Sequence, residues 1–358
     1  MIEDGRKMML KAIVCMTAVV MGLCGFSGGL KEVSRKVIRE SEHPMNFCFA
    51  KLYSDGHIHL DHTFGTHRED ERAGGMYSAD SGRTWAKGMP PIPGINSFET
   101  KDGRKRSLEV WNRICTNEHV MTLMTLERDG SVSREKVRVS LPFDCWCLAH
   151  RETVRLRNGR LLQTMYGHPK GGNRNIAYLM TSSDDGMSWQ FLSKLPFEPD
   201  AVEGASEPNV VELRDGALLA FVRTCCPWYG DGRHTLMQYA SRDGGKTWGE
   251  RKVISETGVA PQAQVLSDGT LAVLSGRPGV FLLLDPSGKG ENYSRHDIYT
   301  GMGSSYSTLM ETAPGKLLLV YDESSFIGKP GPSPTNRIVA VTYRYKTLTN
   351  TNKRRSAR

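Results

Sequence analysis

The stretch Ser241-Arg242-Asp243-Gly244-Gly245-Lys246-Thr247-Trp248 occurs twice earlier in the chain in nearly the same form. Ser78 to Trp85 and Ser182 to Trp189 keep its serine, aspartate, glycine and tryptophan at the same spacing, and each copy follows an apolar run. A short Asp or Ser side chain hydrogen-bonds to its own turn, glycine accepts a positive φ, and tryptophan buries a large ring. We therefore expect each copy to form a hairpin turn, with a degenerate fourth copy at Asp285-Pro286-Ser287-Gly288.

A second series of turns runs in phase with these boxes. Short apolar runs flank tight turns at Asp55-Gly56, Asn158-Gly159, Asp215-Gly216, Asp268-Gly269 and Pro314-Gly315, with Asp129-Gly130 as a further candidate. Such turns between apolar runs predict β-hairpins. The box aspartate follows the turn by 25, 26 and 28 residues in the three complete copies (55 to 80, 158 to 184, 215 to 243). One unit of roughly 50 residues therefore holds four antiparallel strands.

Repeats of this size are typical of a β-propeller. Because six turns are counted, the sequence predicts an all-β, six-bladed propeller over residues 43–345. The last strand, Arg337 to Tyr345, is expected to close the ring beside a strand near Phe47 to Leu52.

Composition and charge limit the classes of function. The 358 residues are 39% hydrophobic and 24% charged, which excludes a disordered chain. The mean hydropathy of −0.41 excludes a protein with many membrane spans. Residues 344–358 carry six of the 47 basic residues and no acid, and without them 41 basic and 39 acidic groups leave +2 of the net charge of +8. We therefore read residues 346–358 as a basic tail and expect no nucleic-acid partner.

The N-terminus predicts export. Arg6, Lys7 and Lys11 precede the uncharged run 12–29, which ends in small residues. This pattern is typical of a secretory signal, here over residues 1–28. The run is barely long enough to span a bilayer, so an uncleaved anchor stays open as the one expected contact with a membrane. The predicted location is therefore secreted or periplasmic.

The cysteine count agrees with an oxidising compartment. Six of the eight cysteines lie beyond the signal, an even number, and we expect buried thiols or disulfides. Their spacing does not match a metal site. The six are Cys48, Cys115, Cys145, Cys147, Cys225 and Cys226.

The boxes resemble the Asp-boxes, or BNR repeats, of the exo-sialidase superfamily, which has a six-bladed propeller fold. The resemblance covers about residues 43–345. It implies that the boxes lie on outer turns, away from the active centre. Because other Asp-box propellers bind proteins or hydrolyse other sugars, the boxes predict the fold and not the chemistry.

Two further segments resemble the sialidase pattern and imply catalytic roles. Glu207 to Leu219, followed by Arg223, resembles the segment that supplies a glutamate and an arginine for the substrate carboxylate. Ser304 to Asp322 resembles the segment with the nucleophilic tyrosine, which implies Tyr306. A tyrosine has a pKa of about 10 and needs a carboxylate that takes its proton. The alternative is that Tyr306 is a core residue and Glu207 a turn carboxylate.

Arginines are the expected substrate-binding residues, because a guanidinium grips a carboxylate through two parallel hydrogen bonds. Arg223 fits by motif, and Arg277 in the next blade is the second candidate. An ordinary ion pair is the alternative for either. The first arginine of the family belongs to an Arg-Ile-Pro motif, and the corresponding position here is Asn46, followed by Phe47 and Cys48. This departure puts sialic acid itself in question.

The general acid of the family is an aspartate between the first hairpin and the first box. Asp70 is nearest in position, with Asp61 and Glu69 as alternatives. The same stretch contains four histidines, which fit a metal site, a sugar-binding channel wall or a solvated strand. We expect no metal and no cofactor. The histidines are His57, His59, His62 and His67.

The predicted function is that of a retaining exo-glycosidase of the sialidase type, which releases terminal acidic sugars from a glycan substrate through a tyrosine nucleophile. Two alternatives stay open. One is a propeller glycosidase that acts on uronic-acid or deoxysugar ends. The other is a non-catalytic propeller that binds glycans or proteins.

Overall fold

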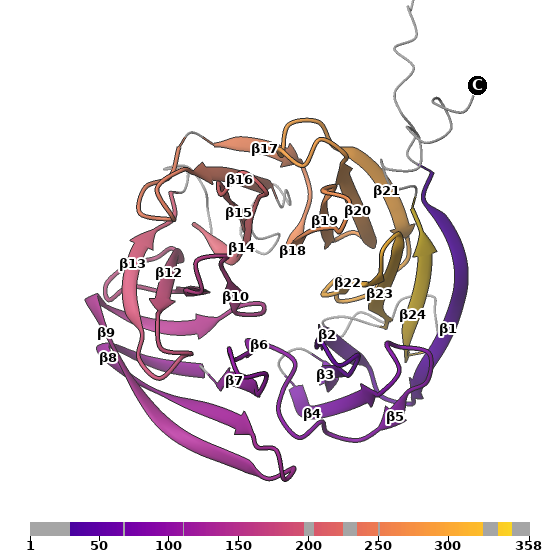
Figure 1. Ribbon diagram of the computed structural model, residues 1–358, viewed down its shortest axis with the longest axis horizontal. Coiled ribbons are helices and arrows are strands. Elements are labelled where there is room, and N and C mark those ends of the chain that lie inside the picture. Colours follow the sequence, from indigo (N-terminus) through magenta and orange to yellow (C-terminus); the bar gives the residue numbers. More distant parts are fainter. Residues whose placement is uncertain are drawn as a thin grey trace, which may run out of the picture.

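The computed structural model describes residues 29–66, 69–109, 111–196, 204–224, 235–249, 251–324 and 336–345, without the side chains of residues 66, 69–71 and 111–113. These ranges contain 24 strands and no helix, and hence no helix that could cross a membrane. The sheets stand in a ring, as a propeller does (Figure 1). The predicted signal, the basic tail, Cys225, Cys226 and His67 lie outside the described residues.

Four of the sheets in the described part have four strands each. Within each sheet, consecutive strands pair antiparallel. Their strands are β2 (Met45–Leu52), β3 (Ile58–Thr66), β4 (Glu69–Ser78) and β5 (Ala86–Lys87); β14 (Ser206–Glu212), β15 (Leu218–Arg223), β16 (Leu236–Ser241) and β17 (Lys252–Ser255); β18 (Val259–Val265), β19 (Leu271–Gly276), β20 (Val280–Asp285) and β21 (Ser294–Tyr299); and β22 (Thr308–Ala313), β23 (Lys316–Glu323), β24 (Asn336–Arg344) and β1 (Lys31–Ser41).

The fifth sheet has eight strands, so the described residues do not form the six separate sheets that we expected. The reason is the length of β9, whose end runs on beside β11 and pairs Leu148 with Tyr166 and Ala149 with Met165. The strands of this sheet are β6 (Ser97–Glu99), β7 (Lys105–Glu109), β8 (Trp111–Leu126), β9 (Val132–Ala149), β10 (Val154–Arg155), β11 (Leu161–Gly167), β12 (Ile176–Ser182) and β13 (Gln190–Lys194).

The prediction for the closing strand is wrong. β24 lies between β23 and β1, so that Val341 pairs with Leu319 on one side and with Arg35 on the other. Residues 47–52 belong instead to β2, in the next sheet. β1 forms the outer edge of the ring in Figure 1 and precedes the expected propeller start at residue 43. It has no fully buried residue, and an edge strand without a buried face leaves no alternating pattern in the sequence.

The boxes form the predicted turns between the third and fourth strands. In the second copy, Ser182 Oγ donates to Asp184 Oδ1 at 2.8 Å, and Ser188 donates to the same carboxylate from N at 3.0 Å and from Oγ at 2.6 Å. Trp189 Nε1 donates to Gly186 O at 2.9 Å. The degenerate copy forms a comparable turn between β20 and β21, where the Asp285 carboxylate accepts three backbone N–H groups.

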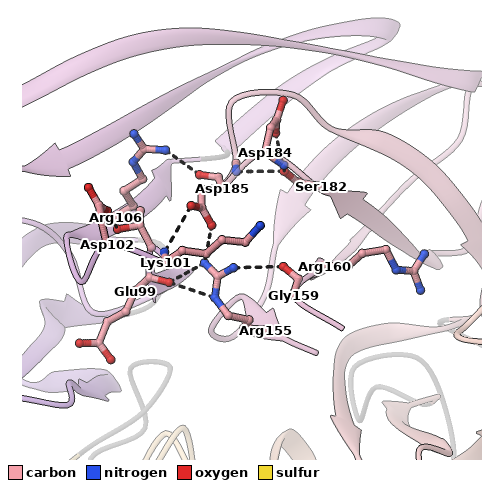
Figure 2. Close-up of polar contacts among 12 residues, drawn as sticks. Glu99, Lys101, Asp102, Arg106, Arg155, Gly159, Arg160, Ser182, Asp184 and Asp185 are labelled. Carbon is pink, nitrogen blue, oxygen red and sulfur yellow. Dashed lines mark hydrogen bonds and ion pairs between the residues drawn. The ribbon is translucent and has the colours of Figure 1, made fainter. Parts of the chain in front are cut away.

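Figure 2 shows how the second box is tied to the strands beside it. Arg155 Nη2 lies 2.7 Å from Asp185 Oδ1 and donates to Glu99 O at 2.6 Å. Arg106 Nη1 donates to Asp185 O at 2.7 Å. These contacts join β7 and β10 to the box turn, and we therefore assign the box a structural part in the fold.

The predicted turn glycines give the sheets a common orientation. Gly56, Gly159, Gly216, Gly269 and Gly315 have φ between 77° and 98°, and each lies between the first and second strands of a repeat. For β6 and β7 this turn is Asp102-Gly103, which the sequence analysis did not select, whereas Asp129-Gly130 joins β8 and β9. Since the first strands all end at the turn face, their starts and the ends of the second strands lie at the opposite face.

The core consists of apolar clusters between neighbouring sheets. One cluster packs Leu282 of β20 against Leu319 of β23, and another packs Leu60 of β3 against Leu318. Cys48, Cys145 and Cys147 are buried thiols, and the described residues contain no disulfide. Burial of this apolar surface is what fixes each sheet against the next.

Candidate active site

Six non-glycine residues with φ between 44° and 66° recur along the first strands or just before them. A side chain rarely adopts this left-handed conformation, which costs of order 1–3 kcal/mol and is concentrated at functional sites. In β2, β14 and β18 the left-handed residue coincides with a shift in strand register. The six are Phe47, Asn96, Arg151, Glu207, Ala260 and Ser305.

Glu207, one of these six, is the centre of a buried polar cluster. Tyr306, between β21 and β22, donates its phenolic O–H to Glu207 Oε1. Arg223, at the end of β15, donates from Nη1 to the same oxygen at 2.6 Å. The amide of Ala260 in β18 donates to Glu207 Oε2 at 2.8 Å. The Glu207 side chain is 4% exposed and that of Arg223 5%, while Tyr306 is half-buried. The predicted nucleophile, its carboxylate partner and one predicted arginine therefore lie together.

The charges around Glu207 keep it ionised. Burial by itself raises the pKa of a carboxyl, but the Arg223 guanidinium, the His150 ring (which is charged only at the acid pH where Glu207 titrates), the Tyr306 hydroxyl and Arg277 together hold the pKa of Glu207 at about 2. Burial raises the pKa of Tyr306, and the Glu207 charge raises it further. At neutral pH the pair is therefore a phenol that donates and a carboxylate that accepts.

Arg277, the second predicted arginine, lies beside the ring of Tyr306. Its guanidinium carbon is 5.7 Å from the centre of the Tyr306 ring, and its Nη2 donates to Ser304 O at 2.9 Å. Arg277 is half-buried and follows β19 directly. Both predicted substrate-binding arginines thus belong to the surroundings of Tyr306, and each has a partner inside the protein.

Arg151 is a functional candidate that the sequence analysis missed. The residue is 2% exposed, and it donates from Nε to Pro261 O at 3.1 Å and from Nη1 to Ser307 O at 2.8 Å. A third bond runs from Nη2 to Ala260 O. Burial lowers the pKa of Arg151 to about 10. The guanidinium therefore ties β18 and the start of β22 to the connection that precedes β10.

Its neighbour His150 was missed as well. His150 Nδ1 lies 3.1 Å from Pro208 O, and burial lowers the pKa of the ring to about 3, so His150 is neutral at physiological pH. Arg151 precedes the turn glycine Gly159 by eight residues, and Glu207 precedes Gly216 by nine. Alignment of the repeats on their turn glycines would have placed both residues at the site.

Two aromatic rings of β2 lie beside Tyr306, close in sequence to Asn46, the position at which the resemblance implies the first arginine. The ring of Phe47 meets Tyr306 edge to face with 4.6 Å between ring centres, and Phe49 lies 5.8 Å from Tyr306. Asn46 is buried and donates from Nδ2 to Gly65 O at 2.8 Å. The side of the site next to β2 is therefore apolar and carries no guanidinium from residues 46–48.

Of the three candidates for the general acid, the structure describes the side chain of Asp61 alone. Those of Asp70 and Glu69 lie outside the described residues. Asp61 Oδ2 accepts the Ile95 amide at 2.8 Å, and burial raises the pKa of Asp61 to about 7. The described contact of Asp61 is thus with the segment before β6.

The described histidines of the same stretch take separate structural parts. His57 Nδ1 pairs with Asp55 at 2.9 Å, whereas His59 Nδ1 contacts Ile92 O at 2.9 Å. His62 packs against Phe64, with 4.8 Å between ring centres. Among the side chains that the structure describes, no group of three or more His, Cys, Asp or Glu could hold a metal ion.

The repeats match a known family. A model of the BNR repeat-like domain aligns with residues 106–319, which is more than half of the chain. The chain belongs to this family. The family that the sequence analysis predicted is therefore confirmed. The comparison with curated proteins found no significant match to the chain.

The fold of this BNR repeat-like protein is shared by several solved structures. A Dyadobacter fermentans protein of unknown function has a TM-score of 0.69 at 17% identity, over 89% of this chain and all of its own. A Hadza microbial sialidase has 0.61 at 16%, over 86% of this chain and 66% of its own. A Penicillium chrysogenum α-L-arabinanase has 0.63 at 12%, over 87% and 98%. At these identities the likeness shows the fold alone.

A separate cavity opens at the turn face of this BNR repeat-like ring. Its volume is about 560 Å³, and Glu152, Glu212, Gln262 and Glu311 are among its lining residues. The lining residues come from the ends of the first strands, and the Tyr306 cluster is not among them. We place the candidate active site at Tyr306 because a paired donor and acceptor lie there, and not in this cavity.

Proposed function

We propose that the chain is a retaining glycoside hydrolase with Tyr306 as its nucleophile. The observation that carries the proposal is the hydrogen bond from Tyr306 to Glu207, a carboxylate that Arg223 holds ionised inside a buried cluster. A tyrosine attacks only if a base takes its proton. Glu207 lies where such a base is needed, and no bound cofactor is required.

The proposed step forms a bond between the Tyr306 oxygen and the anomeric carbon while the bond from that carbon to the leaving oxygen breaks. The phenolic proton passes to Glu207. Because the pKa of Tyr306 is raised and that of Glu207 lowered, the proton leaves only as the new bond forms. A general acid protonates the leaving oxygen, a role that the resemblance gives to Asp70. Water then attacks the anomeric carbon while the bond from that carbon to the Tyr306 oxygen breaks. The residue that acted as general acid takes a proton from this water, and Glu207 returns the phenolic proton to Tyr306, so that the sugar leaves with its anomeric configuration retained.

Sialic acid is the first candidate for the released sugar. It carries a carboxylate on the anomeric carbon itself, and a neutral tyrosine approaches such a centre without charge repulsion. The Arg277 guanidinium beside Tyr306 supports an acidic sugar. A glycan partner and action outside the cytoplasm belong to the same proposal.

A different terminal sugar is the second candidate, and Phe47 favours it. The ring of Phe47, next to Asn46 at the position of the first arginine of the sialidase pattern, lies beside Tyr306. An apolar wall suits the C–H face of a sugar without a carboxylate, such as a deoxysugar. The arabinanase among the structures of the same fold makes a neutral furanoside a further member of this class.

We also propose that the ring has six blades, with the eight-stranded sheet counted as two. The six left-handed residues support this count, because they follow one another at intervals of 45 to 56 residues, one for every four strands. On this view the continuation of β9 beside β11 bridges two blades.

The test is hydrolysis of 4-methylumbelliferyl glycosides of sialic acid, glucuronic acid, fucose and arabinofuranose. The wild type should release the fluorophore from one of them, and Tyr306→Phe should lose more than about 100-fold in rate. Tyr77→Phe, at an exposed tyrosine of β4, is the matched control and should keep its rate. A fluorinated analogue of the sugar that is cleaved should label Tyr306. Full activity of Tyr306→Phe, or no turnover of any glycoside by folded wild type, would contradict the proposal.

A further inference from the structure

Three cross-strand pairs line one face of the ribbon between the end of β9 and the end of β11. The register sets Leu148 opposite Tyr166. It continues beyond β11, because Trp146 N donates to His168 O at 3.0 Å and Lys170 N donates to Asp144 O at 2.9 Å. Alternate residues of a strand face the same side, and Cys145, Cys147 and Gly167 are buried on the other side. We call the six residues of the less buried face the ladder: Asp144, Trp146, Leu148, Tyr166, His168 and Lys170.

The ladder combines aromatic faces with polar ends. The rings of Trp146 and His168 stack, with 5.4 Å between centres and 20° between planes, and Tyr166 meets Trp146 at 6.2 Å. All three rings are half-buried. At the outer end, Lys170 Nζ lies 3.6 Å from Asp144 Oδ2, and these side chains are 74% and 39% exposed. A sugar presents both chemistries, since its C–H face packs on an aromatic ring and its hydroxyls bond to charged groups.

Ring contacts connect the ladder to the candidate active site. Tyr166 lies 6.0 Å from His150, His150 lies 6.0 Å from Phe49, and Phe49 lies 5.8 Å from Tyr306. Tyr166 also follows its turn glycine by seven residues, as Arg223 follows Gly216. Both therefore stand at the face of the ring that holds the Tyr306 cluster. A chain bound with its end at Tyr306 would therefore lie on the same face of the ring as the ladder.

We propose that the ladder binds the glycan residues next to the sugar that is cleaved at Tyr306. The inference rests on the proposed function for the position of the chain end. It commits to a carbohydrate because a stable protein interface takes about 20–30 residues a side, far more than the ladder offers. The class of ligand is a neutral sugar residue of the chain, stacked on Trp146 and bonded to Asp144 and Lys170.

The experiment measures binding in the Tyr306→Phe background, where turnover does not interfere. The probes are 3′-sialyllactose and linear arabinohexaose, with sialic acid and arabinose as their single-residue controls, titrated by calorimetry. One oligosaccharide should bind more tightly than its monosaccharide. Trp146→Ala should reduce that ratio of affinities about tenfold, whereas Tyr77→Ala should leave it unchanged. Lys170→Met, at a side chain that is 74% exposed, should reduce the ratio in the same direction.

The outcomes separate this inference from the proposed function. If no aryl glycoside is hydrolysed but an oligosaccharide binds and its binding requires Trp146, the binding role of the ladder is supported and the proposed function is contradicted. If aryl glycosides are hydrolysed but neither chain length nor Trp146 affects binding, the ladder alone fails. An unchanged affinity ratio in Lys170→Met and in a folded Trp146→Ala overturns the inference, and so does the absence of binding by both oligosaccharides.

Discussion

The Glu207 carboxylate should stabilise the fold by about 3 kcal/mol at neutral pH, and Glu207→Gln tests this. Folding lowers the pKa of this group from 4.5 to about 2. At about 1.4 kcal/mol for each pH unit, the ionised form gains about 3 kcal/mol in the folded state. The side chain is only 4% exposed, so solvent screening takes away little of this energy. Removal of one partner of a buried ion pair costs a similar amount, about 3–5 kcal/mol.

The sign of the pH dependence follows from the direction of the shift. As the pH falls, the unfolded chain takes up this proton first, because the pKa is lower in the folded state. The stabilisation is therefore complete above about pH 4.5 and disappears as the pH falls through 2. At pH 3 roughly half of it should remain.

Urea unfolding, followed by tryptophan fluorescence at pH 7 and pH 3, measures the difference between wild type and Glu207→Gln. We expect about 3 kcal/mol at pH 7 and about half of that at pH 3. Glu212→Gln is the matched control, in the same strand but partly exposed, and should cost under about 1 kcal/mol. A difference for Glu207→Gln that is equal at both pH values, or below about 1 kcal/mol at pH 7, would refute the reasoning.

Three further predictions concern the fold around the site. Burial raises the pKa of Asp322 to about 7, so the contribution of Asp322 to stability is complete below pH 3.8 and is lost as the pH rises through 7. The melting temperature of the wild type should therefore fall over this range, and Asp322→Asn should make that fall smaller. An unchanged dependence of melting temperature on pH in the variant would contradict this. Asp184→Ala removes the carboxylate of the second box and should cost about 1–2 kcal/mol in urea unfolding, with no change in KM. A Cβ on Gly167 would lie 1.7 Å from Trp146 O, so Gly167→Ala should lower the free energy of unfolding by more than about 3 kcal/mol. Gly103→Ala, at a position with open space around it, should lower it by about 1 kcal/mol. Equal losses for the two variants would rule out the close approach of β9 and β11.

Most of the strand order could be predicted because it depends on local turn chemistry. The boxes and the turn glycines are read from a few consecutive residues, and they lie where the sequence places them. β1 could not be predicted, because its partner β24 lies some 300 residues away in the sequence and its exposed faces give no apolar pattern. The joining of β9 to β11 is also a matter of register over a distance, which no short motif encodes.

The candidate site divides in the same way. Tyr306, Glu207 and Arg223 could be predicted because each belongs to a motif that resembles a known pattern. Arg151 belongs to no such motif, and its partners are the backbone carbonyls of Pro261, Ala260 and Ser307, which any residue type could supply. Only its distance from the turn glycine Gly159 indicates its place at the site. The contact between Phe47 and Tyr306 could not be predicted either. It arises because the first and last sheets meet when the ring closes, and no sequence pattern near residue 47 indicates it.

The part that Arg151 plays follows from the left-handed residues themselves. A left-handed residue turns its peptide groups away from the regular ladder of the strand, so that they need other partners. At Ala260 the amide finds the Glu207 carboxylate and the carbonyl finds the Arg151 guanidinium. The carboxylate that faces Tyr306 is thus held by a distorted strand, and a buried guanidinium holds that strand in turn. Since the guanidinium is planar and donates in several fixed directions at once, it can satisfy carbonyls from two strands together, which a lysine ammonium on the same backbone does less well. The geometry at Tyr306 therefore depends on a residue that does not contact it through any described bond.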